Sequence, residues 1–379
     1  MLKNKSKGIT LVALVITIII LLILAGISIS ALTNTGIFGK AKDAKQKSAD
    51  AELDQNTKLD EYENEIDNYL PKQNSNKTVE QSKEKVLSTE KNIELVDAKE
   101  NKIVIPAGFK IIGDATTVDK GIVIEDATVD KDGKPTATAG SQFVWVPVGK
   151  ITKADGTETT ITLGRYDFDE TTGTESAYSG DFVEEDSNNP STLKKIEGKS
   201  IAKNITNFKN SVKANGGYYI GRYEARTTTA RTASGNALTQ ITEKGTDQVY
   251  NYVTQQQAAE QAQGMYTSNN FTSDLMNSYA WDTAITFIQK CTDKTNYANK
   301  NSLNESLSQT GTTNDNPCNI FDMASNVYEW TTETSDGPYD PCVRRGGICG
   351  NSNFCTSNRL NIETYYTNAD VGFRPLLYL

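Results

Sequence analysis

The sequence predicts an α+β protein in which a long N-terminal membrane helix precedes an irregular domain. Residues 9–31 form an uncharged, almost wholly apolar run, which as a helix is long enough to cross a bilayer. From about residue 100, short strand-like runs alternate with long polar loops and few helical patterns. Such a mixture is typical of an α+β fold.

The first residues form a short basic leader that ends in glycine. Residues 1–8 close with Gly8, and the apolar run begins at Ile9. A secretory signal has its small-residue cleavage site after the apolar run, whereas here the break precedes it. This order resembles a type IV prepilin. The resemblance implies that a prepilin peptidase cuts between Gly8 and Ile9 and methylates the new N-terminus; an uncleaved anchor is the alternative.

Ala13 stands at the fifth position after this cut, where most pilins have glutamate. In that family the carboxylate pairs with the N-terminal amine of a neighbouring subunit, which would otherwise be a buried, uncompensated charge. We therefore expect a minor or tip-located pilin, or a pilin-like anchor in the cell membrane with an extracytoplasmic domain. Pilus or pseudopilus subunits are the implied partners, and a purely structural minor pilin is an alternative function.

The remaining N-terminal segments are polar. Residues 59–70 carry apolar side chains at helical spacing, so the helix of residues 9–70 is predicted to have a transmembrane half and an amphipathic half. A solvated stalk is the alternative for the second half. Residues 71–99 contain few large apolar side chains and are predicted to be a linker. The domain then occupies residues 100–379.

Composition excludes several functions. The net charge is −9, and no dense basic run follows the leader, so we expect no nucleic-acid binding. The chain has no histidine, which excludes Ser-His and Cys-His nucleophiles and His-ligated zinc or iron. Five cysteines lie in the last quarter, at spacings that do not form a CxxC…CxxC zinc site.

Three motifs characterise the domain. They are FVWVPVG at 143–149, DMASNVYEW at 322–330, and RRGG at 344–347 followed by VGFRP at 371–375. Their order resembles the formylglycine-generating-enzyme, or sulfatase-modifying-factor, branch of the C-type-lectin-like fold, over roughly residues 140–379. We predict strands at 103–105, 109–112, 121–126, 143–148 and 216–226, a helix over 279–291, and long loops or an insertion over 152–215.

The catalytic branch of this family binds copper through two cysteines that follow paired glycines and are separated by four residues. Here Cys349 and Cys355 follow the glycines at 346–347 but are separated by five residues and are out of register. We therefore expect no copper and, without histidine, no iron. The domain is predicted to be non-catalytic, with a formylglycine-generating oxidase as the alternative. A local disulfide or two free thiols are expected for the cysteines.

The resemblance also implies a calcium site in the DMASNVYEW motif. By position, the ligands would be the side chains of Asp322 and Glu329 and the main-chain carbonyls of Ser325 and Val327, and oxygen ligands suit a hard cation. Ser325 replaces a glycine that the family usually has there. The alternative is structural, with the polar groups of the motif satisfying buried backbone groups. Arg374 is expected to pair with a buried acid.

Residues 348–370 lie between two scaffold-like motifs and mix Asn, Ser, Thr and Tyr with isolated large apolar side chains. Tyrosine and asparagine give contact area and adaptable hydrogen bonds at low entropic cost. The variable proteins of diversity-generating retroelements carry their variable region in the same segment of this fold. The resemblance implies a face that binds an extracellular ligand, either a protein or a cell surface; an ordinary polar loop is the alternative. The candidate contact residues are Asn351, Asn353, Phe354, Asn358, Asn361, Tyr365 and Tyr366.

Overall fold

The computed structural model describes residues 18–22, 58, 77–185, 187, 197–234, 245, 247–301 and 305–379. The chain divides into two compact units, Met1–Ser75 and Asn76–Leu379. The leader, the cleavage site at Gly8 and Ile9, and nearly all of the helix predicted over residues 9–70 lie outside the described residues. Among the residues that are described, no helix combines the length and the apolar character needed to cross a membrane.

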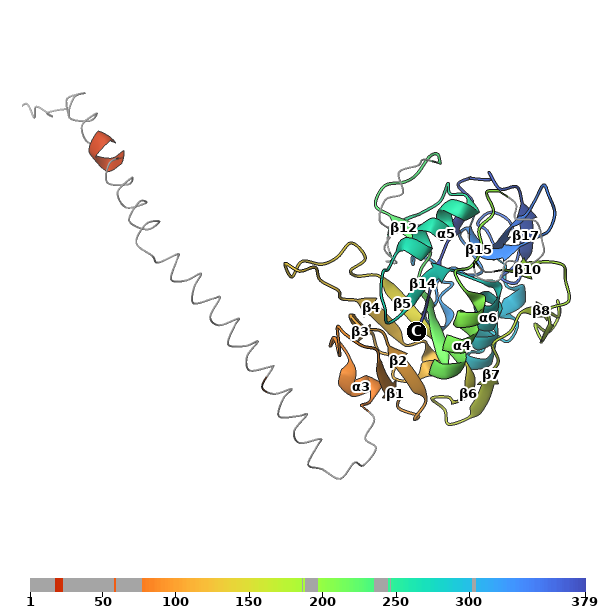
Figure 1. The fold of residues 1–379 in the computed structure, drawn as a ribbon, viewed down its shortest axis with the longest axis horizontal. Helices are drawn as coiled ribbons and strands as arrows, with labels where there is room; N and C mark the ends of the chain where they lie inside the picture. The colour runs from red at the N-terminus through yellow and green to blue at the C-terminus, as the bar shows by residue number, and fades with distance from the viewer. Residues whose placement is uncertain are drawn as a thin grey trace, which may run out of the picture. The chain divides into compact units, whose positions relative to one another are not determined.

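An antiparallel sheet of six strands lies in the unit Asn76–Leu379 (Figure 1). Its strand order is β14-β19-β11-β5-β4-β3. The central strand β5 is buried over Phe143–Pro147, as its continuous apolar run predicts for a strand that is covered on both faces. The six strands are β3 (Phe109–Ile112), β4 (Val123–Asp126), β5 (Gln142–Pro147), β11 (Gly217–Gly221), β14 (Thr272–Leu275) and β19 (Pro375–Tyr378).

A second sheet has the order β10-β15-β16-β17, with β18 parallel to β15. All seven residues of β15 are buried, whereas β17 is an edge strand with partly exposed side chains. The sheet comprises β10 (Val183–Glu184), β15 (Tyr328–Thr334), β16 (Cys342–Arg345), β17 (Arg359–Ile362) and β18 (Val371–Phe373).

Helices and small hairpins complete this unit. The longest helix, α6, begins after Asn277, whose side chain accepts a hydrogen bond from the Ala280 N–H and so caps the helix. The helices are α3 (Val79–Ser82), α4 (Ile205–Asn215), α5 (Gln255–Gly264) and α6 (Ser278–Cys291), with short 3₁₀ turns η1 (Val118–Lys120), η2 (Tyr297–Asn299) and η3 (Pro317–Asn319). The two-stranded pairs are β1 (Ile93–Val96) with β2 (Lys102–Ile105), β6 (Gly149–Thr152) with β7 (Glu158–Ile161), β8 (Tyr166–Phe168) with β9 (Glu175–Ala177), and β12 (Arg226–Thr227) with β13 (Gln248–Val249).

Two clusters of buried apolar side chains form the interior. The larger cluster includes residues of the six-stranded sheet, α4 and α6, with Trp145 and Trp281 fully buried. The smaller cluster surrounds Trp330 of β15 and includes alanines of α5 and residues of β18. Both clusters belong to residues 76–379, so this unit holds the apolar interior that it needs to fold by itself.

The structure confirms the predicted strands and the helix near residues 279–291. It differs from the predicted linker, because residues 77–99 contain α3 and β1 and contribute Val79 and Leu95 to the interior. The segment has few large apolar residues, but Val79 and Leu95 are fully buried and anchor it to the interior. The segment 152–215 is also more ordered than a set of loops, because it contains β7, the pair β8–β9, β10 and α4.

Candidate functional site

The DMASNVYEW motif forms a turn that leads into β15. Asp322 and Asn326 have φ angles of 66° and 68°, a left-handed conformation that these residue types tolerate better than most. Ser325 is not among the described residues with positive φ, so serine replaces glycine there without backbone strain. The turn carries the acidic side chains inward, and Asp322 and Glu329 have no exposed surface.

Glu329 forms a buried, two-pronged ion pair with Arg374. Arg374 Nε donates to Glu329 Oε2 at 3.0 Å and Nη2 donates to Oε1 at 2.6 Å. The guanidinium also donates to the carbonyls of Gly221 and Phe321, at 2.8 and 2.7 Å. Burial raises the pKa of the Glu329 carboxyl, and Arg374 acts in the opposite direction. The prediction that Arg374 pairs with a buried acid is confirmed.

Asp322 is satisfied by groups of neighbouring turns. Its Oδ2 accepts from the Gly311 N–H at 3.3 Å, and its Oδ1 accepts from the Ser325 hydroxyl at 3.2 Å and from the Thr313 hydroxyl. Burial raises the pKa of Asp322, although the hydrogen bond from Thr313 lowers it. Both carboxylate oxygens therefore already have donors.

Glu224 is a third fully buried acid beside this turn. It accepts from Asn326 Nδ2 at 2.6 Å and from the Val327 N–H at 3.3 Å. Burial raises the pKa of Glu224 well above its usual range, and the nearby Asp322 and Glu329 raise it further. Sequence reasoning missed this residue, although an acid inside the strand-like run GRYEAR was a signal for it.

The predicted calcium ligands are close together, but their oxygens are engaged. A guanidinium takes both oxygens of Glu329, and hydroxyl and amide groups take those of Asp322. Within the described residues, no three or more His, Cys, Asp or Glu side chains gather in a metal-binding arrangement. With only the carbonyls of Ser325 and Val327 remaining, the set as arranged does not fit a calcium ion. The calcium site that the resemblance implies is therefore set against a buried ion pair, and thermal melts in calcium and in chelator can distinguish the two.

Six of the seven predicted contact residues lie at the two ends of the pair β16–β17. Arg345 pairs with Arg359 and Cys342 pairs with Ile362. The connection 346–358 therefore lies at one end of the pair, while the residues after Ile362 lie at the other. The predicted binding face is thus divided between two places, with Asn361 on the strand itself.

Three of the seven residues serve the fold. Phe354 packs edge-on against Tyr328, with ring centroids 5.4 Å apart. Asn358 Oδ1 accepts from a main-chain N–H of its own loop at 2.6 Å. The Tyr366 hydroxyl donates to Asp370 at 2.9 Å. These side chains are partly buried, so removing them would disturb the hairpin itself.

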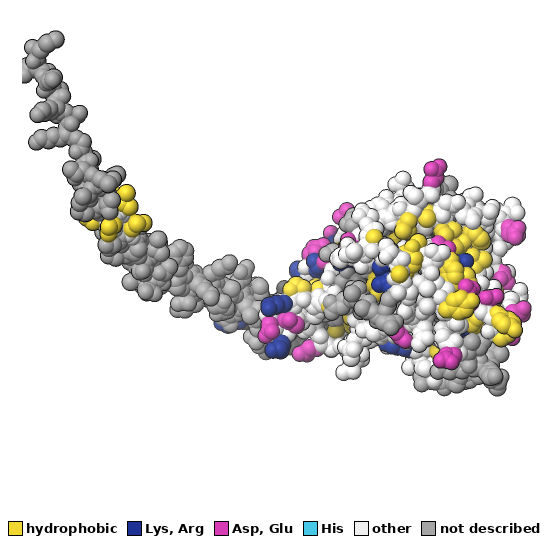
Figure 2. All heavy atoms as spheres, turned by 90° about the horizontal axis from the view of Figure 1, so that it is seen from above, with side chains coloured by type: hydrophobic (Ala, Val, Ile, Leu, Met, Phe, Trp, Pro, Cys, Tyr) yellow, Lys and Arg dark blue, Asp and Glu magenta, His cyan; other side chains and the backbone are white. Residues whose placement is uncertain are grey.

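Three of the other four are exposed, and one further tyrosine joins them. Asn353 and Asn361 are exposed, Asn351 is half-buried and Tyr365 is 75% exposed. Tyr339, which sequence reasoning missed, is 83% exposed. Figure 2 shows hydrophobic side chains, a class that there includes tyrosine, gathered in patches on one face of the domain. A tyrosine within the turn-rich run SDGPYDP was the signal for Tyr339.

All five cysteines carry free thiols. Cys349 and Cys355 therefore have the expected arrangement of two free thiols and do not form a local disulfide. Burial raises the pKa of the Cys349 thiol. Cys355 Sγ lies 2.7 Å from Asn358 Oδ1, to which it donates.

The sequence profile of the sulfatase-modifying factor enzyme 1-like domain matches residues 129–377. The chain belongs to this family. The resemblance stated for residues 140–379 is thereby confirmed. The family domain holds both the DMASNVYEW turn and the pair β16–β17, whereas β1 to β4 precede the matched residues.

Several solved structures resemble this family domain at low sequence identity. Treponema denticola variable protein 1 is 14% identical, with 65% of this chain and 99% of that chain covered and a TM-score of 0.36. PvdO from Pseudomonas aeruginosa is 13% identical, with coverage of 63% and 95% and a TM-score of 0.34. CarF is 15% identical, with coverage of 43% and 86% and a TM-score of 0.30. No curated protein sequence matches the chain.

Proposed function

We propose that this protein is a cell-surface display protein whose sulfatase-modifying-factor-like domain binds an extracellular ligand without catalysing a reaction. The observation that carries the proposal is the exposure of Tyr339 and Tyr365, at 83% and 75%. Aromatic side chains such as tyrosine dominate the binding energy of many protein interfaces.

The two tyrosines lie at the same end of the pair β16–β17. Tyr339 precedes Cys342 in the chain, Tyr365 follows Ile362, and those two strand residues face each other. Asn361 Nδ2 donates to the Asp340 carbonyl at 3.3 Å and so ties the loop of Tyr339 to β17. This arrangement supports a binding face with two aromatic side chains and adaptable amides, suited to a protein or a cell-surface ligand.

At the opposite end of the pair β16–β17, the connection 346–358 is a loop held at both ends by the fold. Arg345 is fully buried and its Nε donates to the Asn358 carbonyl at 2.8 Å, which fixes the point where the connection 346–358 returns to β17. Asn351 and Asn353 lie between these fixed ends. Such a loop can change its exposed residues without loss of the fold, as diversification by a retroelement requires.

A formylglycine-generating oxidase is the enzymatic alternative in this family. It would need two thiolates at one copper site. In this chain the two cysteines after the paired glycines, Cys349 and Cys355, are separated by five residues instead of four, and soft-metal ligation is sensitive to geometry. The cysteines therefore favour the non-catalytic function.

The N-terminal segment supplies the display part of the proposal. An uncharged apolar run over residues 9–31 suits a single membrane span, and a prepilin peptidase would release Ile9 as the new N-terminus. The domain would then lie outside the cytoplasm, on the cell membrane or at a pilus tip beside other pilin subunits.

Adhesion of cells that express the full chain tests the binding face. The double variant Tyr339→Ala/Tyr365→Ala should reduce adhesion to a panel of bacterial and animal cells at least about tenfold, because hot-spot aromatics contribute roughly 2 kcal/mol or more each. Its unfolding free energy should change by less than about 0.5 kcal/mol per substitution. Thr160→Ala, at an exposed threonine of β7, is the control. A folded double variant that adheres as well as the wild type refutes the proposal.

A further inference from the structure

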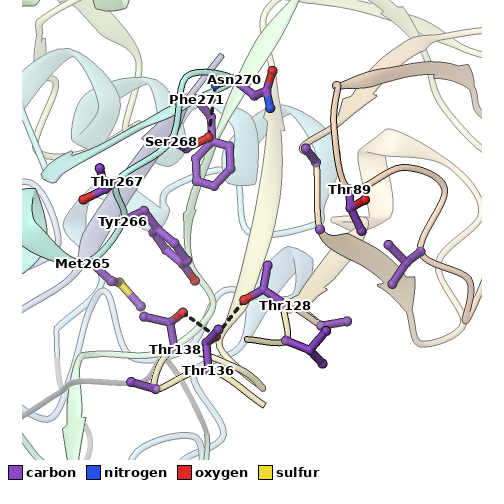
Figure 3. Close-up of a pocket in the computed structure, with 16 residues that line it drawn as sticks. Thr89, Thr128, Thr136, Thr138, Met265, Tyr266, Thr267, Ser268, Asn270 and Phe271 are labelled. Carbon is purple, nitrogen blue, oxygen red and sulfur yellow. Dashed lines mark hydrogen bonds between the residues drawn. The ribbon is translucent and has the colours of Figure 1, made fainter. Parts of the chain in front are cut away.

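A cavity of about 640 Å³ lies outside both the motif turn and the pair β16–β17. Its walls come from residues 86–89 after α3, residues 107–108 before β3, residues 127–138 after β4, and residues 265–271 between α5 and β14 (Figure 3). The volume is within the range of small-molecule sites. Several of its lining residues precede the segment 129–377 that the family profile matches, so this cavity is not simply part of the family domain.

A buried carboxylate fixes two walls of the cavity. Asp126 is 1% exposed; its Oδ1 accepts from the Thr128 N–H at 2.8 Å and from the Thr128 hydroxyl at 2.7 Å, while its Oδ2 accepts from the Tyr266 hydroxyl at 3.0 Å. Gly108 approaches so closely that a Cβ there would lie 2.4 Å from Thr128 Cγ2, and its φ is +84°. The Gly108 carbonyl accepts from the Ala127 N–H at 3.0 Å. The walls are therefore held in place before any ligand binds.

The hydrogen bonds to Asp126 also set the direction of a row of hydroxyls. Thr128 gives its proton to the carboxylate, so in the 2.7 Å contact between Thr128 Oγ1 and Thr136 Oγ1 the donor must be Thr136. The Thr136 oxygen can then only accept further hydrogen bonds, and Thr138 Oγ1 lies 3.4 Å from it. Figure 3 shows this row along one side of the cavity. A ligand with an O–H donor matches an acceptor of this kind.

The rest of the lining suits an uncharged ligand. Among the described residues that line the cavity none is charged, so a charged ligand would lose its hydration without a counter-charge. Thr89 and Thr267 are exposed threonines that also line the cavity. The rings of Tyr266 and Phe271, with centroids 5.3 Å apart, give an apolar surface. Hydroxyl groups on one side and aliphatic C–H groups on the other are the chemistry of a sugar ring.

We propose that this cavity binds a neutral carbohydrate. The proposal is independent of the binding face at Tyr339 and Tyr365. Because Ala107, Ala127, Ala137 and Met265 all line the cavity, methyl NMR of residues 76–379 labelled at alanine and methionine reports on it directly. The probes are neutral sugars (glucose, galactose, mannose, N-acetylglucosamine and its dimer), with sialic acid, glucose 6-phosphate and an uncharged tripeptide for comparison.

At least one neutral sugar should shift these methyl signals in a saturable manner. Thr136→Val should weaken that sugar roughly five- to tenfold, the effect of losing one neutral hydrogen bond, and Ala137→Arg, at an exposed position of the rim, should block binding. Thr160→Val, at an exposed threonine of β7 outside the cavity, should leave it unchanged. The proposal is overturned if no neutral sugar shifts these signals at tens of millimolar, or if the charged sugars or the tripeptide bind as tightly.

Discussion

Replacing Glu329 with glutamine should destabilise the domain whether or not calcium is present. Both oxygens of Glu329 accept hydrogen bonds from Arg374, at 3.0 and 2.6 Å, and neither side chain has exposed surface. Glutamine keeps the shape of the side chain but removes its negative charge. The guanidinium is then left inside the protein without its counter-charge.

The size of this effect separates an ion pair from a calcium site. Removing one partner of a buried ion pair destabilises a protein by about 3–5 kcal/mol. At roughly 2–4 °C for each kcal/mol, the melting temperature should fall by roughly 6–20 °C. A calcium ion at a hundredfold excess over its dissociation constant would add about 2.7 kcal/mol, and would do so only when it is present.

Thermal melts of residues 76–379 in calcium and in chelator measure both effects. We expect the wild type to melt alike in the two buffers and Glu329→Gln to melt lower in both. The double variant Glu329→Gln/Arg374→Met removes both charges and should recover part of the loss. If the wild type melts higher in calcium, and Glu329→Gln abolishes only that difference, the carboxylate is a calcium ligand and the reasoning from the ion pair is wrong.

Three further predictions concern other parts of the chain. Glu184 is partly exposed as a residue, but its carboxylate accepts from the Ser278 N–H at 2.6 Å and the Thr332 hydroxyl at 2.8 Å, and burial raises its pKa from 4.5 to about 7. Because the folded state holds this proton more tightly, the free energy of unfolding should be highest below pH 4.5. It should fall by up to about 3 kcal/mol as the pH rises through 7. Urea unfolding of Glu184→Gln at a series of pH values should lack this decline. When the domain is mixed with copper and a cysteine-containing peptide, an oxygen electrode should record no oxygen consumption. If the wild type does consume oxygen and Cys349→Ser does not, the non-catalytic function is contradicted. Mass spectrometry of the mature protein should find a methylated Ile9 at the N-terminus, and an intact Met1 in cells that possess the peptidase would show that the leader is not cut.

The elements that the sequence predicted are those whose apolar pattern is strong. The run at 143–148 is almost continuously apolar, and it is the central strand β5. The helix α6 has large apolar residues at helical spacing, among them Trp281, Ile285 and Ile288, which are fully buried. In both segments the local apolar pattern agrees with tertiary burial: a short continuous run gives a buried strand, and helical spacing gives a helix.

Contacts between distant residues were not accessible to this reasoning. Glu224 and Asn326 are 102 residues apart in sequence and lie 2.6 Å apart as donor and acceptor. Likewise, the residues of α3 and β1 looked like a linker because their composition is polar, while position in the fold decides that Val79 and Leu95 are buried. Composition measures an average over a segment, whereas burial is decided residue by residue.

The segment 348–370 shows how far this limit affects the function. Tyr365 and Tyr366 are neighbours in sequence, yet Tyr365 is 75% exposed. The Tyr366 hydroxyl donates to Asp370, and the Arg344 guanidinium lies over the Tyr366 ring, 4.8 Å from the ring centroid. Both lie in the turn after β17, where the Tyr366 N–H donates to the Glu363 carbonyl at 3.2 Å, and the geometry of this turn distinguishes them. If the segment is diversified, selection for folding must hold Tyr366 constant and leave Tyr365 free to change. Variation between copies of the gene should therefore follow exposure in the hairpin and not position in the sequence.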